Sequence, residues 1–269
     1  MNFLVSIITP AYNVEDFIKE TIESVINQTY KNWELIIVDD CSKDETFSVA
    51  QQMAETDARI KPVKAPLNGG AAAARNLGTT LANGEYIAFL DSDDLWHQEK
   101  LEIQLKEMVN KNAVFSYSAY HVVSESGEYL RDVKVPDFVD YKTLLKGCDI
   151  GCLTAMYDVQ KLGKQYFLQP DSANNNTGLP ENILRRWGRE DYVLWLSIAK
   201  QCEVLNRKMI GIRQELAYYR KRDGGISANK RKSSKFQWIV YRNVERLNFF
   251  YASYNFILYA INGVRKHYF

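Results

Sequence analysis

The sequence lacks a long apolar run. None of its hydrophobic stretches reaches the roughly 18 residues that a membrane-spanning helix needs. The first residues show no basic segment followed by an apolar run and a cleavage site, so we expect no signal peptide. The charges are nearly balanced, with 34 Lys and Arg against 33 Asp and Glu. This balance gives no argument for nucleic acid binding.

Cysteine is scarce and is not arranged in paired CxxC motifs. The four cysteines are Cys41, Cys148, Cys152 and Cys202. Cys148 and Cys152 form a CxxxC spacing, which is weak evidence for a metal. We expect free thiols in a reducing compartment.

The composition is that of an ordinary globular protein, with 46% hydrophobic and 25% charged residues in a chain of 269. This length allows one large α/β domain, or one domain with an appendage. Buried strands are predicted at residues 3–9, 33–38 and 86–90, and helices at 17–26, 46–56, 71–81 and 98–111. A short strand is predicted at 60–64, and Pro62 marks it as an edge or irregular strand. The alternation predicts a doubly wound, mostly parallel sheet with helices on both faces.

The second half of the chain has a different pattern. Strands are predicted at 113–121, 129–133 and 152–157, a short helix at 141–146 and a longer one at 189–200. Residues 209–219 are mixed, with strand character toward their end. The Asn-rich segment 169–180 is predicted to be a loop, and loops of this length are usually mobile or functional.

Three of the first four predicted strands end in segments of interest. These are Pro10-Ala11-Tyr12, Asp39-Asp40 and Asp91-Ser92-Asp93. Ligands of such sheets bind beyond the carboxyl ends of the strands, so the three segments are expected to share one site. Crowded carboxylates repel one another, and the acids at 91, 93 and 94 therefore indicate a compensating cation. The alternative is a polar turn in which one acid caps the next helix.

Residues 228–269 form a segment of different composition, which we expect to be a C-terminal helical appendage. Basic residues such as Lys230 and Arg231 occur beside aromatic clusters such as Phe249-Phe250-Tyr251. One interpretation is a pair of helices lying on an anionic membrane surface. The other is a helical hairpin packed on the globular domain, or on a second subunit in a homodimer.

The chain resembles the family 2 glycosyltransferases, which have the GT-A fold and transfer sugars from nucleotide donors with inversion. Six segments carry the resemblance in order: VSIITPAYN (5–13), NQTY (27–30), ELIIVDDCSKDET (34–46), NGGAAAARNLG (68–78), GEYIAFLDSDDLW (84–96) and REDYVLW (189–195). The resemblance extends over residues 3–227, so a GT-A domain is expected at 1–227.

The resemblance implies a UDP-sugar site at the strand ends. Tyr12 would stack on the nucleobase, with Pro10 and Ala11 shaping the base pocket. Asp40 would accept a hydrogen bond from uracil N3–H, because an acceptor-only carboxylate matches that donor. Asp39 is expected to cap the turn.

Asp91-Ser92-Asp93 resembles the DxD motif of the family. Asp93 is expected to ligate Mg²⁺ or Mn²⁺ directly, while Asp91 contacts the ribose or metal-bound waters and Ser92 lies at the nucleotide. Asp94 is expected to serve mainly the start of the following helix. Arg75 would lie near the base and the phosphates; the alternative for it is a salt bridge to a structural acid.

Asp191 resembles the catalytic base of the family, which takes a proton from the acceptor hydroxyl. Glu190 would hold the acceptor or orient the base; the alternative is that both acids simply favour a helix N-terminus. Residues 218–222 resemble a Tyr-Arg-x-His segment, with Arg222 where His is common. This departure speaks against a metal ligand there, and Arg220 or Arg222 would instead bind the diphosphate.

Together these features predict an inverting hexosyl- or N-acetylhexosaminyl-transferase. It would move one sugar from a UDP-sugar to a hydroxyl of a lipid-linked glycan, as in bacterial surface-polysaccharide assembly. The chain lacks the QxxRW pattern of processive synthases, which favours transfer of a single sugar. We expect a cytoplasmic enzyme, peripheral on the inner face of the cell membrane. The alternatives are a nucleotidyltransferase acting on sugar phosphates and a non-catalytic nucleotide-sugar binding protein.

Overall fold

A computed structural model describes residues 2–169, 188–222 and 230–268. The expected loop at 169–180 lies outside these residues except for Gln169, and so does the expected domain boundary at 227. The division of the chain into residues 1–227 and 228–269 therefore stays a prediction.

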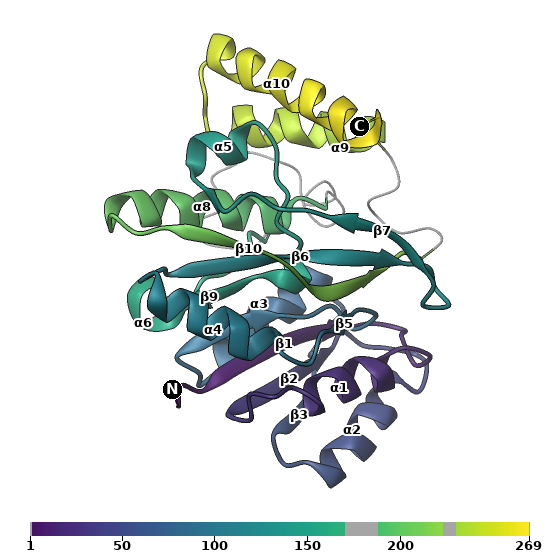
Figure 1. Cartoon of the computed structure of the whole chain (residues 1–269). Coiled ribbons are helices and arrows are strands. Elements are labelled where there is room, and N and C mark those ends of the chain that lie inside the picture. The colour runs from purple at the N-terminus through teal and green to yellow at the C-terminus, as the bar shows by residue number, and fades with distance from the viewer. Residues whose placement is uncertain (1, 170–187, 223–229, 269) are drawn as a thin grey trace.

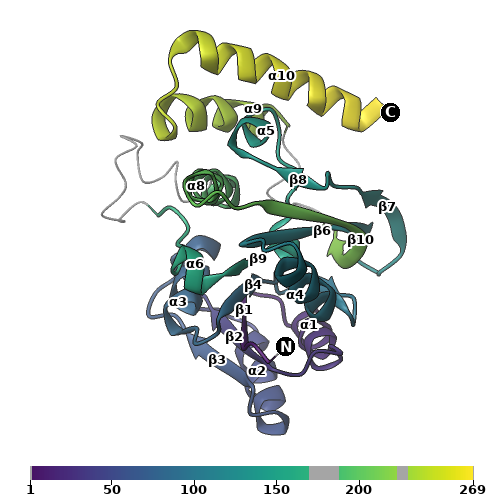
Figure 2. The ribbon, with the colours of Figure 1, turned by 60° about the vertical axis from the view of Figure 1, so that its left-hand side comes forward.

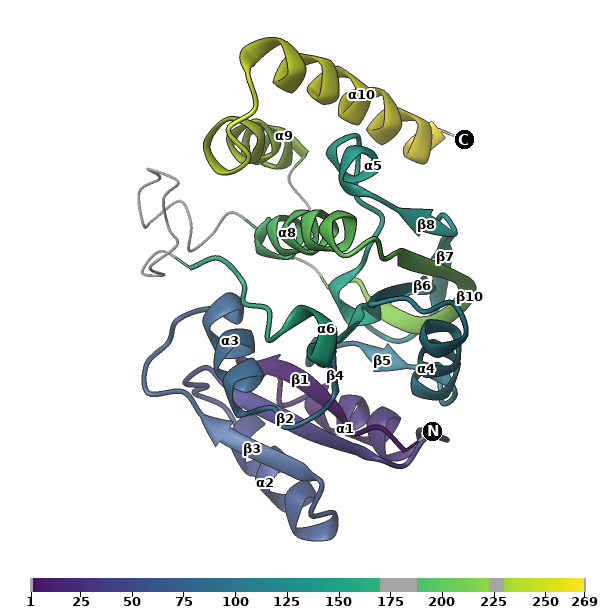
Figure 3. The same ribbon diagram turned by 90° about the vertical axis from the view of Figure 1, so that its left-hand side faces the viewer.

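The first half of the chain folds as the alternating pattern predicts. Strands β1 (Val5–Ala11), β2 (Trp33–Asp39), β3 (Ile60–Lys64) and β4 (Tyr86–Phe89) are parallel and lie in the order β3-β2-β1-β4. Helices α1 (Ile18–Ile26), α2 (Thr46–Thr56) and α3 (Ala71–Leu81) connect them, and α4 (Lys100–Asn110) follows. Figure 3 shows α3 beside β1 and β2.

The second half extends the same sheet with mixed pairing, in the order β4-β9-β6-β10-β5. Its strands are β5 (Leu95–Trp96), β6 (Phe115–Val123), β7 (Tyr129–Val133), β8 (Phe138–Val139), β9 (Met156–Asp158) and β10 (Met209–Arg220). Only β6 and β10 pair in parallel there, so the sheet as a whole is mixed. The strand expected at 152–157 is partly wrong, because Cys152–Thr154 is a 3-10 turn that precedes β9.

The two faces of the sheet bury different cores, because successive side chains of a strand point to opposite faces. Ile7 packs with one core and Ile8 with the other. The core around Ile7 includes residues of α1 and α4, and the core around Ile8 includes residues of α3, α8 (Glu190–Val204) and α5 (Tyr141–Leu145). Helix α6 (Val159–Leu162) follows β9. Both faces are covered by helices, as predicted.

The C-terminal helices pack on the globular body. Helix α9 (Lys230–Ile239), a π-helical turn (Val240–Val244) and α10 (Phe249–Tyr268) lie beyond α5 and α8 in Figures 1 and 2. Tyr241 donates a hydrogen bond to the Leu145 carbonyl, and its ring is fully buried. The packing interpretation is therefore confirmed for one side of this segment. Within the described residues, no helix has the length and apolarity needed to cross a bilayer.

Candidate active site

The turn after β4 is held in place from three directions. The Arg75 guanidinium lies 2.5 Å from an Asp91 carboxylate oxygen, and the Arg222 guanidinium lies 3.2 Å from Asp93. The Thr21 hydroxyl on α1 donates to the carbonyl oxygens of Ser92 and Asp94, at 3.0 and 2.9 Å. This acidic turn is therefore an anchored structure and not a loose connection.

The three acids of the turn have different environments. Burial and the neighbouring charge of Asp91 raise the pKa of Asp93. Asp94 is fully buried, and burial raises its pKa well above the usual range. One Asp94 carboxylate oxygen accepts a hydrogen bond from the Arg220 backbone N–H at 2.8 Å. Asp94 therefore joins the turn to β10, and the expectation that it serves the start of α4 is wrong.

The residues of the turn fit a divalent cation. Asp91 and Asp93 offer hard carboxylate oxygens on partly exposed side chains. Their mutual repulsion is part of what raises the pKa of Asp93, and a bound cation would relieve it. Within the part of the chain that the structure describes, no group of three or more His, Cys, Asp or Glu side chains is placed to hold a metal. Among the described residues the turn thus offers the carboxylates of Asp91 and Asp93, and phosphate oxygens or water could complete the coordination.

The end of β1 gives the other wall of the site. Pro10 and Ala11 are buried in the strand, and the Ala11 carbonyl accepts a hydrogen bond from the Asp40 N–H at 2.8 Å. Tyr12, the next residue, is 46% exposed. Its ring is available for stacking, as the sequence predicts for a nucleobase-binding tyrosine.

Asp40 is committed to the loop that precedes α3. Its two carboxylate oxygens accept hydrogen bonds from the N–H groups of Gly69 and Gly70, at 2.9 and 2.8 Å. Gly70 has a φ of 83°, a left-handed conformation that favours glycine. Asp39 accepts from the Ser42 N–H at 3.3 Å through both oxygens, in agreement with its expected role in the turn. Cys41, which lies between Asp40 and Ser42, also has a positive φ of 64°, so the chain turns sharply after β2.

Arg75 is the cation at the centre of the site. Its side chain is buried, and its Cζ lies 5.2 Å from the centre of the Phe167 ring. The nearby carboxylates of Asp91 and Glu190 help to raise its pKa, although burial works against them. Arg75 therefore forms a salt bridge as the alternative interpretation held, but its partner is an acid of the candidate site.

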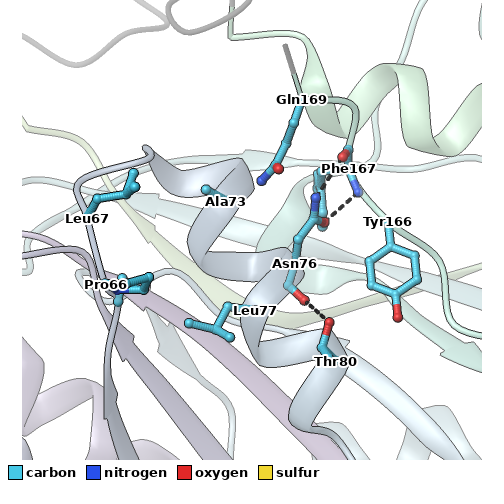
Figure 4. A pocket seen from close by; sticks show the side chains of 10 residues that line it. Pro66, Leu67, Ala73, Asn76, Leu77, Thr80, Tyr166, Phe167 and Gln169 are labelled. Atoms are coloured by element: carbon cyan, nitrogen blue, oxygen red, sulfur yellow. Dashed lines mark hydrogen bonds between the residues drawn. The ribbon is translucent and has the colours of Figure 1, made fainter. Parts of the chain in front are cut away.

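Phe167 is fixed by Asn76, one residue along α3. The Asn76 side-chain amide donates to the Phe167 carbonyl at 2.8 Å and accepts from the Phe167 N–H at 2.7 Å (Figure 4). On the outer side of this pair lies a groove of about 510 Å³ between α3 and residues 65–67 and 166–169. Leu67 and Tyr166 line it and are exposed. The sequence pattern gave no sign of this groove.

The N-terminus of α8 supplies the second pair of acids. Burial and the adjacent Glu190 raise the pKa of Asp191 to about 6, although the Tyr192 N–H donates to its carboxylate at 2.7 Å. Glu190 has one buried carboxylate oxygen with no hydrogen-bond partner among the described residues. A helix N-terminus normally favours ionised acids, so the raised pKa of Asp191 shows that burial outweighs the dipole here.

Cys152 is a buried residue near the site whose surroundings the sequence did not predict. Burial is the main cause that raises the pKa of its thiol well above the usual range, and the charges of Arg75, Asp91, Asp191 and Glu190 also affect it. The sequence offered only the CxxxC spacing with Cys148, because the charged neighbours of Cys152 come from three distant segments.

The two arginines of β10 and its continuation differ in their contacts. The Arg220 guanidinium is almost fully buried, lies 2.6 Å from Glu20 and donates to the Glu125 carbonyl at 3.2 Å. Arg222 is partly exposed and contacts Asp93. Of the two candidates for diphosphate binding, the contacts favour Arg222 and assign Arg220 to holding β10 against α1.

Comparison with known proteins gives the family. The family model for glycosyl transferase family 2 matches residues 6–161. The chain belongs to this family. Relatives that match over nearly their whole length include TuaG of Bacillus subtilis (strain 168), described as a "Putative teichuronic acid biosynthesis glycosyltransferase", with 40% identity over 98% of this chain and 97% of TuaG. WfgD of Escherichia coli, a UDP-Glc:alpha-D-GlcNAc-diphosphoundecaprenol beta-1,3-glucosyltransferase, is 38% identical over 99% of this chain and 96% of WfgD.

Solved structures agree with the fold of this glycosyltransferase. TarS of S. aureus, residues 1–349 in complex with UDP-GlcNAc, superposes with a TM-score of 0.67 over 89% of this chain and 66% of the TarS chain, at 21% identity. Mannosyltransferase PcManGT from Pyrobaculum calidifontis, in complex with GDP-Man and Mn2+, superposes with a TM-score of 0.55. At these identities the likeness supports the GT-A fold and no more.

Proposed function

We propose that this glycosyltransferase moves one sugar from a UDP-sugar to a hydroxyl group of a lipid-linked glycan, with inversion at the anomeric carbon. The observation that carries the proposal is the acidic turn after β4, where Arg75 and Arg222 pair with Asp91 and Asp93. The Arg75 guanidinium lies 2.5 Å from Asp91, and the charge of Glu190 also contributes to the raised pKa of Arg75. These observations support one site that includes both acidic pairs.

Asp191 is the proposed general base. A base works best when its pKa lies near the operating pH, and burial raises that of Asp191 to about 6. At pH 7 to 8 the carboxylate is ionised and still basic enough to take the proton of an attacking hydroxyl. Direct attack by that hydroxyl on the anomeric carbon, opposite the leaving diphosphate, inverts the configuration there.

Asp91 and Asp93 are the proposed metal-binding residues, and Mg²⁺ or Mn²⁺ bound there would neutralise charge on the leaving nucleoside diphosphate. Arg222 approaches the same turn from β10, where it supplies a further positive charge for the diphosphate. Arg75 keeps Asp91 oriented through their salt bridge.

The base pocket is proposed to lie between Tyr12 and the turn after β2. Both oxygens of Asp40 are already bonded to glycine N–H groups, so Asp40 supports this pocket by fixing the loop before α3. Asp39 makes only 3.3 Å contacts with Ser42. Each carboxylate oxygen can accept a second hydrogen bond, so Asp40 keeps the proposed role of uracil N3–H acceptor and Asp39 the role of holding the turn.

The lipid-linked acceptor is proposed from two relatives. WfgD and WfaP of Escherichia coli are both described as acting on alpha-D-GlcNAc-diphosphoundecaprenol, at 38% and 36% identity to this chain. The description of TuaG, which names teichuronic acid biosynthesis, supports a bacterial polysaccharide as the final product that contains the transferred sugar.

The test is a screen of UDP-sugars with GlcNAc-diphosphoundecaprenol in detergent, with Mn²⁺ or with EDTA. We expect acceptor-dependent release of UDP with one donor, loss of that release in EDTA, and a product of opposite anomeric configuration by NMR. Release with GDP-sugars alone, or a product with retained configuration, would contradict the proposal.

A further inference from the structure

Helix α10 exposes an apolar face from Phe250 to Ile261. Phe250, Tyr254, Ile257 and Ile261 follow one another at intervals of four, three and four residues, which places them on one side of the helix. Phe250 is 85% exposed and Ile257 59% exposed. The opposite side, with Ala252 and Asn255, is buried on the protein.

No charged residue interrupts this face. The sequence from Phe249 to Gly263 contains no Asp, Glu, Lys or Arg. A solvent-facing helix normally carries charged residues on its outer side, and a contiguous exposed apolar face marks an interaction surface. The face is therefore unlike the exposed surface of an ordinary packed helix.

The charge of the chain is divided unevenly between the C-terminal segment that contains this face and the rest of the sequence. Residues 230–269 contain eight Lys or Arg and one acid, Glu245, so their formal charge is +7. The other 229 residues contain the remaining 26 basic and 32 acidic residues, so their charge is −6. A basic segment that carries an apolar helix face complements an anionic lipid surface, where each Lys or Arg near the surface contributes about 1 kcal/mol of attraction.

We propose that the exposed face of α10 is the surface by which this enzyme lies on an anionic lipid bilayer. The apolar side chains enter the boundary between headgroups and acyl chains, and the basic residues of 230–269 attract the anionic headgroups. A second copy of the chain would offer the same positive charge and is disfavoured for that reason.

The same helix contacts the base end of the site. The Arg189 guanidinium donates to the Tyr259 hydroxyl of α10 at 3.0 Å, and Arg189 directly precedes Glu190 and Asp191. A bilayer that holds α10 therefore lies near the residues that receive the acceptor hydroxyl. This step rests on the proposed lipid-linked acceptor, because it explains how a membrane-held acceptor meets the base.

The experiment is flotation of the full-length protein with vesicles of phosphatidylglycerol and phosphatidylcholine, or of phosphatidylcholine alone, without donor or acceptor. We expect binding to the anionic vesicles only, and a loss of about tenfold or more in the variant Phe250→Ser/Ile257→Ser. The matched control is Phe138→Ser/Val204→Ser, which removes two exposed apolar side chains from β8 and α8 and should bind as the wild type does.

Two outcomes would contradict the proposal that α10 binds an anionic bilayer. One is a wild-type protein that stays with neither type of vesicle. The other is a wild-type dimer in light scattering that the Phe250→Ser/Ile257→Ser variant dissociates, with vesicle binding unchanged. These results are independent of sugar transfer, so failure of the proposed function leaves the flotation assay readable.

A second measurement tests the link to the acceptor. With GlcNAc-diphosphate on an undecaprenyl chain in vesicles, the Phe250→Ser/Ile257→Ser variant should show a raised KM, and with a short water-soluble prenyl chain its kinetics should match the wild type. An equal loss on both acceptors would contradict the link, since it would indicate a damaged active site.

Discussion

The acidic pair after β4 and the acidic pair at the start of α8 differ in how their charges are balanced. Asp91 and Asp93 each have an arginine partner, Arg75 and Arg222. Asp191 contacts only the backbone N–H of Tyr192 among its described hydrogen bonds, and burial raises its pKa to about 6. The difference suggests two functions for one residue type: acids with cation partners are suited to binding, and a partly buried acid with a raised pKa is suited to accepting a proton.

The largest expected effect on sugar transfer comes from a change of the proposed general base. Asp191→Asn keeps the shape of the side chain but removes its basicity, so transfer should fall by roughly 10²- to 10⁴-fold. UDP affinity, measured by calorimetry, should stay near that of the wild type because the change lies at the acceptor end. Turnover within threefold of the wild type would remove Asp191 from the mechanism.

A smaller effect is expected at the paired acids. Asp93→Ala removes one of the two carboxylates proposed for the metal, so UDP binding in Mn²⁺ should weaken by at least about tenfold, the loss that even outer-shell changes cause. Binding in EDTA should change little. Asp132→Ala, a change at an acid that pairs with His121 on β6, is the control and should leave both affinities unaltered. An equal loss with and without metal would speak for a structural role of Asp93.

The pH dependence of kcat/KM tests the raised pKa that distinguishes Asp191 from the acids with arginine partners. Because the base must be ionised, kcat/KM should fall with decreasing pH along a limb centred near pH 6. The charge of Glu190 contributes to the raised pKa of Asp191, so Glu190→Gln should move this limb to lower pH by a fraction of a unit. A limb that moves to higher pH, or does not move, would show that Glu190 acts in another way.

The smallest effect concerns stability. The pKa of Asp191 is higher in the folded protein than its usual 3.8, so the folded state binds a proton more readily and is favoured as the pH falls from about 6 toward 4. At pH 7.5 the ionised carboxylate is therefore a cost to folding. Asp191→Asn should raise the free energy of unfolding there by about 1 kcal/mol, discounted for partial exposure, as measured by urea denaturation. A less stable variant at pH 7.5 would contradict the raised pKa.

The sequence predicted the first half of the fold because its signals are local. The helices at 46–56 and 71–81 and the strand at 60–64 agree with the structure at both ends. Apolar strands alternating with amphipathic helices leave few other arrangements, and the ends of parallel strands must meet at one edge. The convergence of the three segments at that edge followed from this rule.

The second half was harder to predict because its structure depends on distant partners. Strand β10 has shifts of register between Ile212 and Glu215 and again before Tyr218, which break the alternation by which strands are recognised. The two-residue strand β5 exists only through its pairing with β10. A pattern read along the chain contains no signal for either feature.

The partners of the site residues were also beyond prediction. Arg222 and Asp93 are 129 positions apart, and the hydrogen bond from the Arg220 backbone to Asp94 spans 126. Asp94 was therefore assigned to the nearest helix, and the hydrogen bonds from Gly69 and Gly70 to Asp40 were not foreseen. Packing of α9 and α10 has a practical consequence as well: deletion of residues 230–269 would uncover the core around Trp195, so point changes are the better test of this segment.

Cys41, at the sharp turn after β2, is a position at which a fluorescent label can be attached. This half-buried thiol directly follows Asp39 and Asp40, where the base of the donor is proposed to lie, while Cys152 and Cys202 are buried. A thiol-reactive fluorophore would thus be directed to Cys41 and to the half-buried Cys148, and a Cys148→Ser protein would carry its label beside the nucleotide. Donor binding and release could then be followed in real time, without a radioactive sugar and before the acceptor is known.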